Sequence, residues 1–378
     1  MGDTQTSRTP PGADQPHDAA TTNTQPAIVP DHVVVVEVDA DDNASDISAR
    51  SVHSSTTSVT SSVFEYRVEN GRTYHGYKEG ITGRKIEINK GCPEEYNLPN
   101  DDKETDRLDL QHNLFLLTFN DQLGTAPINT NGASIGRVLD VGTGTGIWAI
   151  DFGEEHPEAE VRGIDLSAIQ PEFTPPNVWF EIDDLEEPWE YSKPFDYIHS
   201  RMMNSSIGNW KEYIKNCFDN LAPGGYLELN EMDLVPLSDD GTLKSDSKII
   251  KAVTLLQEAL VTIGRQFQVI SDLKTVMIEQ GFTDVTLQKF KWPLNPWPKE
   301  WRHKELGIWN NQNLNDGLEA VYLAPYTRIL GWTKEEVLVF MAEVRKEMND
   351  MSIHAYMPIW SVYGKKPEQE PEDAAGGQ

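Results

Sequence analysis

Short apolar runs alternate with helical stretches through the middle and the end of the chain. Apolar runs at 137–141 and 161–164 predict strands, and the segment between them has helical spacing through Trp148 and Phe152. Further strands are expected at 178–182, 197–198, 226–229, 283–290 and 355–363, and further helices at 210–221, 271–281 and 333–349. Such alternation is typical of a mostly parallel, doubly wound sheet with helices on both faces. The pattern therefore predicts an α/β fold.

Two of these helices carry local end signals. Thr333 and Glu336 have the spacing of a capping box, in which each side chain bonds the backbone of the other residue, before a helix that runs to about Asn349. Ser271 is expected to be the N-cap of a helix that stops at Gly281.

The two ends of the chain lack this pattern. Residues 1–62 are rich in Ser, Thr, Asp, Ala and Pro, and residues 367–378 are acidic and end in glycine, so both are expected to be disordered tails. The β-prone run Val33–Val36 is either a docking strand for a partner or a sticky patch within the first tail. Between the tails we expect an N-terminal helical or lid segment, a doubly wound core, an aromatic cap and a final core strand, at 63–136, 137–291, 292–352 and 353–366.

Charge and cysteine content narrow the class of partner and compartment. The chain has 61 acidic and 32 basic residues among 378, a formal charge of −29, and such a surface repels nucleic acid and anionic membranes. No apolar run is long enough to span a membrane. Cys92 and Cys217 make neither a disulfide framework nor a zinc site. With no signal-sequence pattern at the N-terminus, these features predict an intracellular protein, cytoplasmic or nuclear.

A glycine loop follows the first core strand and opens a helix. Gly142, Gly144 and Gly146 fall at every second residue after Asp140, and position 147 is Ile147 where a dinucleotide fingerprint has its third glycine. This spacing suits S-adenosylmethionine (SAM) and disfavours an NAD-dependent oxidoreductase. Asp140 is a candidate cofactor contact, a turn-capping acid, or both.

Acids at the ends of the next two strands are candidate cofactor ligands. Asp165 ends the second strand, where a carboxylate can accept both ribose hydroxyls, although a loop acid or helix N-cap is the alternative. Asp183 and Asp184 follow the third strand, and one of them could accept from the adenine amino group while Ile182 and Leu185 pack on the ring.

Two stretches resemble methyltransferase motifs. Val138–Ile150 resembles the first motif of class I SAM-dependent methyltransferases, and Leu221–Glu228 resembles their fifth-strand motif. More narrowly, roughly residues 65–366 resemble the fungal LaeA-like methyltransferases, a likeness carried by Glu69–His75, Leu98–Asp101, Arg107–His112, Ile164–Pro171, Pro293–Trp297 and Ile353–Tyr356. The resemblance implies a Rossmann-like core with a seven-stranded, mostly parallel sheet and SAM as cofactor. The family mixes regulators of secondary metabolism with enzymes, and the insert Thr82–Cys92 departs from the regulators.

Candidates for catalysis come from the ends of later strands. Because ligands bind at the carboxyl ends of strands in doubly wound sheets, His199 is the candidate general base and Glu231 a candidate catalytic residue that faces the substrate. Arg201 could contact substrate or cofactor. A structural role for His199 is equally open. His112 and His354 are expected to be packed or structural histidines.

Aromatic residues suggest a lid and a cap. Tyr74 lies in a segment that could fold over the cofactor, or it is simply packed. Five tryptophans gather between 292 and 332, and we expect one or more of Trp297, Trp301 and Trp309 to line one pocket with His199 and Glu231. A cap core without a ligand is the alternative. No residue spacing suggests a metal site.

These observations support two functions on one fold. The leading hypothesis is a SAM-dependent methyltransferase acting on a small molecule of fungal secondary metabolism, favoured by the aromatic cap. The alternative is a LaeA-like nuclear regulator acting through protein partners, favoured by the Ser/Thr-rich tail, which could bind them.

Overall fold

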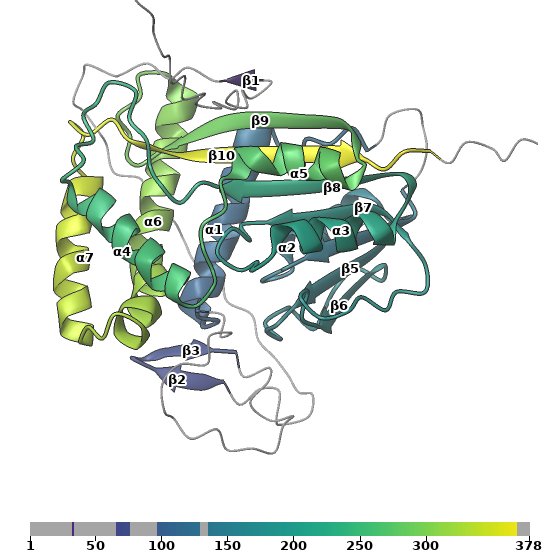
Figure 1. Ribbon diagram of the computed structural model, residues 1–378, viewed down its shortest axis with the longest axis horizontal. Coiled ribbons are helices and arrows are strands. Elements are labelled where there is room, and N and C mark those ends of the chain that lie inside the picture. The colour runs from purple at the N-terminus through teal and green to yellow at the C-terminus, as the bar shows by residue number, and fades with distance from the viewer. Residues whose placement is uncertain (1–31, 34–65, 76–96, 129–134, 369–378) are drawn as a thin grey trace, which may run out of the picture.

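The computed structural model describes residues 32–33, 66–75, 97–128 and 135–368. Its centre is an eight-stranded sheet (Figure 1). From one edge to the other the strands are β1 (His32–Val33), β9 (Thr283–Pro293), β10 (Tyr356–Lys365), β8 (Leu221–Met232), β7 (Phe195–Arg201), β4 (Arg137–Val141), β5 (Glu160–Asp165) and β6 (Val178–Ile182). All neighbours pair in parallel except β10, which is antiparallel to both β8 and β9. Without β1 this is the predicted seven-stranded, mostly parallel sheet of a class I methyltransferase, so the predicted fold class is confirmed.

Both faces of the sheet are buried because apolar side chains alternate along its strands. Val138 faces α2 (Ile147–Glu155), where it packs with Trp148. Leu139 and Val141 face the other way, into a core shared with α3 (Trp210–Asn220) and α5 (Leu273–Gln280). Because successive side chains of β4 point to opposite faces of the sheet, helices pack against both faces.

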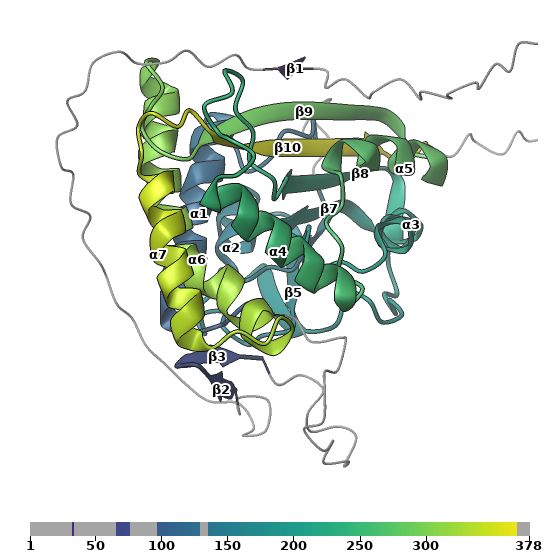
Figure 2. The same ribbon diagram turned by 60° about the vertical axis from the view of Figure 1, so that its left-hand side comes forward.

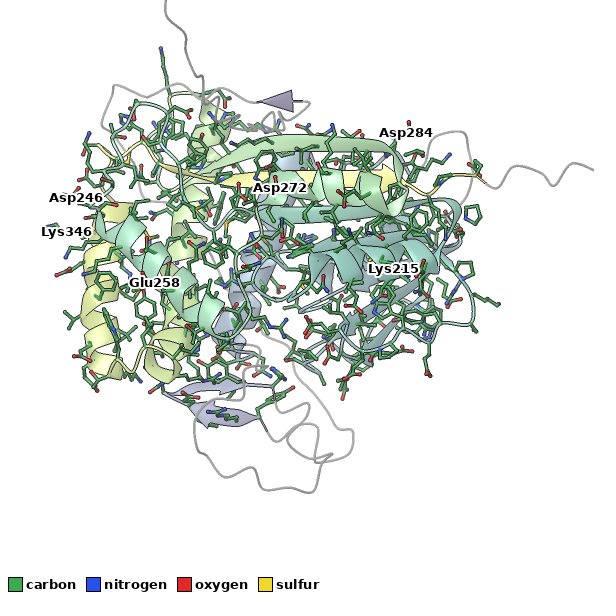
Figure 3. The ribbon with its side chains drawn as sticks, viewed as in Figure 1. Lys215, Asp246, Glu258, Asp272, Asp284 and Lys346 are labelled. Carbon is green, nitrogen blue, oxygen red and sulfur yellow. The ribbon has the colours of Figure 1, made fainter. Side chains whose placement is uncertain are left out.

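A helical cap covers the carboxyl-terminal side of the sheet. It is built from α4 (Lys248–Thr262), α6 (Trp301–Arg328) and α7 (Lys334–Met348), which share one apolar core with α1 (Asp102–Phe119) (Figure 2). Charged side chains such as Glu258 on α4 and Lys346 on α7 are exposed (Figure 3), whereas the apolar stripe of each helix is buried. No helix in the described ranges is long and apolar enough to cross a bilayer.

A short hairpin links the cap to the core. Its strands are β2 (Arg67–Glu69) and β3 (Arg72–Tyr74). Glu69 forms an ion pair with Arg328 of α6 (2.8 Å), and the Tyr66 hydroxyl donates to the Ala168 carbonyl beyond β5 (3.1 Å). The hairpin is therefore held from both sides.

The helix ends and the helical cap match the sequence predictions only in part. The capping box of Thr333 and Glu336 is present. Ser271, however, lies inside a 3-10 turn (Ile270–Asp272) that leads into α5, whose N-cap is Asp272, so the predicted cap is wrong. The helical cap over the sheet also contains α4, a helix that the sequence pattern did not reveal.

Little of the terminal tails falls within the described residues. Of 1–62, only His32 and Val33 are described, and they form the edge strand beside β9. The rest of that tail, most of the tail at 367–378, and the insert at 82–92 lie outside the described residues. The predicted disorder stays a prediction.

Candidate functional site

The glycine loop turns tightly between β4 and α2. Gly142, Gly144 and Gly146 all have positive φ (70°, 58° and 81°), a backbone conformation that residues with a side chain rarely adopt. A Cβ at Gly146 would collide with the Phe180 ring, whereas a Cβ at Gly144 would meet, among the described residues, only Leu108, at 3.5 Å. Leu108 lines the central cavity. Gly144 therefore faces open space, and Gly146 is a packing requirement.

Polar side chains hold this loop in shape. The Thr143 hydroxyl donates to Asp140 Oδ2 (2.6 Å), and the Thr145 hydroxyl donates to Asp109 (2.8 Å). Gln170 donates to the carbonyl of Gly144 (2.7 Å). Asp140 thus acts as a turn-capping acid, one of the two roles left open by the sequence.

Asp165 stands at the carboxyl end of β5, beside Gly144. Its Oδ2 accepts from the amide of Gly144 (2.9 Å) and its Oδ1 accepts from the amide of Ser167 (2.9 Å). Burial, with a smaller contribution from the Asp140 charge, raises the pKa of Asp165 to about 6. The carboxylate lines the cavity, and each oxygen can accept a further hydrogen bond.

The acids after β6 lie on the same cavity. Asp183 accepts from the amide of Asp184 (2.9 Å), Asp184 accepts from the amide of Glu186 (3.1 Å), and both line the cavity with Leu185. The fold therefore gathers Asp140 near the end of β4, Asp165 at the end of β5 and the acids after β6 at one edge of the sheet.

His199 is fully engaged by its neighbours. Its Nδ1 lies 2.8 Å from Asp140 Oδ1, and its Nε2 lies 3.3 Å from the Asn230 amide nitrogen. Its ring stacks on Trp148, with centroids 3.8 Å apart and planes 8° from parallel. Its Nδ1 thus faces the carboxylate of Asp140, and its Nε2 faces the side-chain amide of Asn230. This arrangement favours the structural role that the sequence left open.

Arg201 belongs to a chain of hydrogen bonds beside the cavity. Its Nη1 donates to His112 Nδ1 (3.2 Å), and His112 Nε2 donates to Asp151 (2.9 Å). The guanidinium also lies over the Phe115 ring, 4.9 Å from its centroid. Burial lowers the pKa of Arg201 to about 10, which leaves it charged at neutral pH, and burial likewise lowers the pKa of His112.

Glu231 is a fully buried carboxyl on the cavity wall. Its Oε1 accepts from the amide of Met203 (2.9 Å), whereas its Oε2 has no hydrogen-bond partner among the described residues. Burial raises the pKa of Glu231 to about 8. This residue can therefore exchange a proton near neutral pH.

A single cavity of about 640 Å³ joins these groups to the cap. One end reaches the glycine loop, Asp165, Asp183 and Asp184. The other end, here called the cap lobe, is lined by side chains of α4 (Ile249, Val253, Leu256 and Leu260), α6 (Leu318, Val321 and Tyr322) and α7 (Val344 and Met348). Glu231 and Arg201 line the same cavity, as does Tyr74, whose ring packs under Arg328 at 4.6 Å.

The predicted tryptophan lining needs correction. None of Trp297, Trp301 and Trp309 is among the described residues that line the cavity. Trp297 is buried and donates to the Ala355 carbonyl (2.9 Å), Trp301 is 64% exposed, and Trp309 packs against the cap core. Trp297 and Trp309 therefore contribute to packing around the start of α6.

Other cavity residues were missed from the sequence. Tyr322 lies in the cap lobe, and Arg265 forms an ion pair with Glu186 (2.7 Å) across the cavity rim. Arg107 pairs with Glu104 and donates to Asn313 (2.8 Å). Only Arg107 belonged to a stretch that carried the family resemblance.

No metal-binding group of His, Cys, Asp or Glu occurs among the residues that the structure describes.

Comparisons with known proteins agree with this geometry. Residues 110–287 match the family model of a methyltransferase domain. Methyltransferase pytC of Aspergillus terreus is 40% identical over 333 residues, which cover 88% of this chain and 96% of the relative. Secondary metabolism regulator LAE1 of Cochliobolus heterostrophus is 36% identical over 306 residues, covering 80% and 95% of the two chains. Probable methyltransferase tdiE of Emericella nidulans is 34% identical over 266 residues, covering 70% and 83%.

The sheet order and the glycine loop after β4 define a methyltransferase of class I fold. The chain belongs to the fungal LaeA-like methyltransferase family. It is a SAM-dependent methyltransferase, as its sequence indicated.

Proposed function

We propose that SAM occupies the end of the cavity beside the glycine loop. The residues present fit it: the open side of Gly144 leaves space for close approach, and Asp165 keeps acceptor capacity toward the cavity. We assign Asp165 to the ribose hydroxyls, Asp183 or Asp184 to the adenine amino group, and Leu185 to the ring. SAM supplies an activated methyl group on a sulfonium.

We assign the acceptor to the same cavity, as a small molecule of fungal secondary metabolism. The observation that carries this proposal is that one cavity of about 640 Å³ runs from the glycine loop into the cap lobe. This volume lies within the range of small-molecule sites. The likeness to methyltransferase pytC over nearly its whole length supports an enzyme of this kind.

The chain's own side chains would mainly align the acceptor and move its proton. Transfer from a sulfonium is an in-line displacement that depends on positioning. Glu231 is the better candidate base, because its Oε2 has no partner in the described structure and its pKa is raised to about 8. Both nitrogens of His199 are engaged, so we assign it to positioning. Arg201 would attract an anionic group of the cofactor.

A regulatory role through protein partners is the second candidate. It is favoured by relatives named as secondary metabolism regulators, such as LAE1. The segment that would bind partners, 1–62, falls almost wholly outside the described residues. Nuclear or cytoplasmic localisation stays a prediction.

Comparative mass spectrometry tests the enzymatic proposal. Extracts of cells that express the full chain should contain a metabolite heavier by one methylene unit than its counterpart in deletion extracts. An Asp165→Ala variant, produced at the same level, should restore the deletion profile. If expression levels of biosynthetic genes change equally with the wild type and Asp165→Ala, and no methylated product appears, the regulatory role is favoured.

A further inference from the structure

The walls of the cap lobe are apolar on three helices. On α4, Ile249, Val253, Leu256 and Leu260 follow helical spacing and are each at least nine-tenths buried. Val344 and Met348 continue this surface on α7. A charged ligand placed there would lose its hydration without gaining a partner, which is costly. The lobe therefore selects for an uncharged, mainly apolar body.

The polar residues Asn313, Tyr322 and Arg328 of α6 line the cavity. They differ in whether their polar atoms already have a partner. The Asn313 oxygen accepts from Arg107 (2.8 Å), and Arg328 is paired with Glu69 (2.8 Å). Between them lies Tyr322, whose hydroxyl makes no hydrogen bond to any described residue. Tyr322 is half-buried on the cavity wall, where a ligand could supply the partner that tyrosine hydroxyls away from bulk water normally have.

The Tyr322 hydroxyl keeps its proton. Burial alone raises the pKa of Tyr322 far above its ordinary value of 10. It can thus donate one hydrogen bond and accept another, but it cannot serve as a base near neutral pH. The hydroxyl is suited to holding a polar group of a ligand.

We propose that the cap lobe binds the methyl acceptor, that the acceptor is a largely apolar, uncharged molecule bearing a hydroxyl or carbonyl oxygen, and that the Tyr322 hydroxyl hydrogen-bonds this oxygen. The inference rests on the proposed function, since it concerns the acceptor end of the same cavity. It makes Tyr322 a specificity-determining residue one helical turn before Tyr326.

Tyr326 supplies a matched control on the same helix. Its hydroxyl is buried and donates to the Ala252 carbonyl (2.8 Å). It is not among the described residues that line the cavity. Tyr322→Phe and Tyr326→Phe thus remove the same atom from α6, one facing the cavity and one facing the cap core.

Calorimetry with the full chain, saturated with S-adenosylhomocysteine, tests the proposal with three probes of one shape. Naphthol should bind, naphthalene should bind about five- to tenfold more weakly, and the anion naphthoate should not bind measurably. Tyr322→Phe should lower naphthol affinity by about five- to tenfold, to the level of naphthalene. Tyr326→Phe should leave naphthol affinity unchanged while lowering the unfolding temperature.

Two results would overturn the inference. One is naphthoate binding as tightly as naphthol, and the other is equal naphthol affinity in the wild type and Tyr322→Phe. Failure of all three probes to bind, with S-adenosylhomocysteine still bound, would also count against the cap lobe as acceptor site. Only loss of S-adenosylhomocysteine binding itself would count against the proposed function.

Discussion

The His199 ring lies 2.8 Å from Asp140 through its Nδ1, and this contact links the end of β7 to the strand that leads into the glycine loop. Asp140 in turn holds Thr143 within the loop (2.6 Å). Contacts of His199 and Asp140 therefore link β7, the strand beside β4, to the conformation of the glycine loop. We expect His199 to act by holding Asp140 and the glycine loop in position.

His199→Ala tests this role through stability. The substitution removes a ring stacked on Trp148 and leaves the buried carboxylate of Asp140 without one partner, so the free energy of unfolding should fall by about 2–4 kcal/mol. SAM affinity should fall as well. Urea unfolding and calorimetry measure both quantities.

His354→Ala is the control for that variant. His354 is paired with Asp240 (2.6 Å) away from the cavity and is partly exposed, so the loss should stay below about 1 kcal/mol, with SAM affinity unchanged. Unaltered stability and SAM affinity in His199→Ala, together with a turnover lower by about 10²–10⁴-fold, would instead make His199 the base.

Asp165→Ala tests the ribose assignment. Losing the acceptor for two hydroxyls should weaken SAM binding by roughly ten- to a hundredfold in calorimetry. Asp246→Asn, a change at an exposed residue before α4, is the matched control and should bind SAM like the wild type. Wild-type affinity in Asp165→Ala would remove this carboxylate from the cofactor site.

Glu231 predicts a pH dependence of stability. Its carboxyl, with a pKa raised from 4.5 to about 8, holds a proton in the folded state where the unfolded chain has lost it. Folding stability should therefore decrease as the pH rises from about 4.5 through about 8. Because of this group, the free energy of unfolding should fall by roughly 2 kcal/mol between about pH 6.5 and about pH 8.5.

Glu231→Gln isolates that contribution. Because glutamine does not titrate, the stability of the variant relative to wild type should improve by roughly 2 kcal/mol over the same pH range. Parallel urea unfolding curves at several pH values measure it. A difference between the two proteins that is independent of pH would show that Glu231 is ionised throughout.

Two glycines in the loop should respond differently to alanine. At Gly146 a Cβ would collide with Phe180, so Gly146→Ala should lower stability strongly. At Gly144 a Cβ would meet, within the part of the chain that the structure describes, only Leu108 at 3.5 Å, so Gly144→Ala should lower stability by only about 1–2 kcal/mol because of its positive φ. SAM binding should nevertheless be lost in Gly144→Ala. Thermal melts and calorimetry separate these effects, and SAM binding by Gly144→Ala at wild-type affinity would mean that no ligand approaches there.

Local sequence signals predicted the core of the fold well. Strands β4 and β6 were predicted with the boundaries observed, because each is a short apolar run bounded by turn residues. The capping box at Thr333 marked the start of α7, since its bonds involve only neighbouring residues. Likewise Asp165, Asp183 and Asp184 follow directly from where strands end.

The cap was harder to predict because long-range packing decides it. Whether a tryptophan near 297–309 faces a ligand depends on how α6 lies against β9, which no local pattern contains. Tyr322 reaches the cavity for the same reason. Ser271 was a sound N-cap by residue type, but the chain enters α5 through a 3-10 turn and the helix begins after Asp272.

The most direct test of the account is a calorimetric titration of the purified full chain with SAM and, separately, with NAD. The glycine loop and the acid at the end of β5 predict one SAM site per chain, weakened in Asp165→Ala, and no heat of binding with NAD. Binding of NAD without binding of SAM would contradict the account.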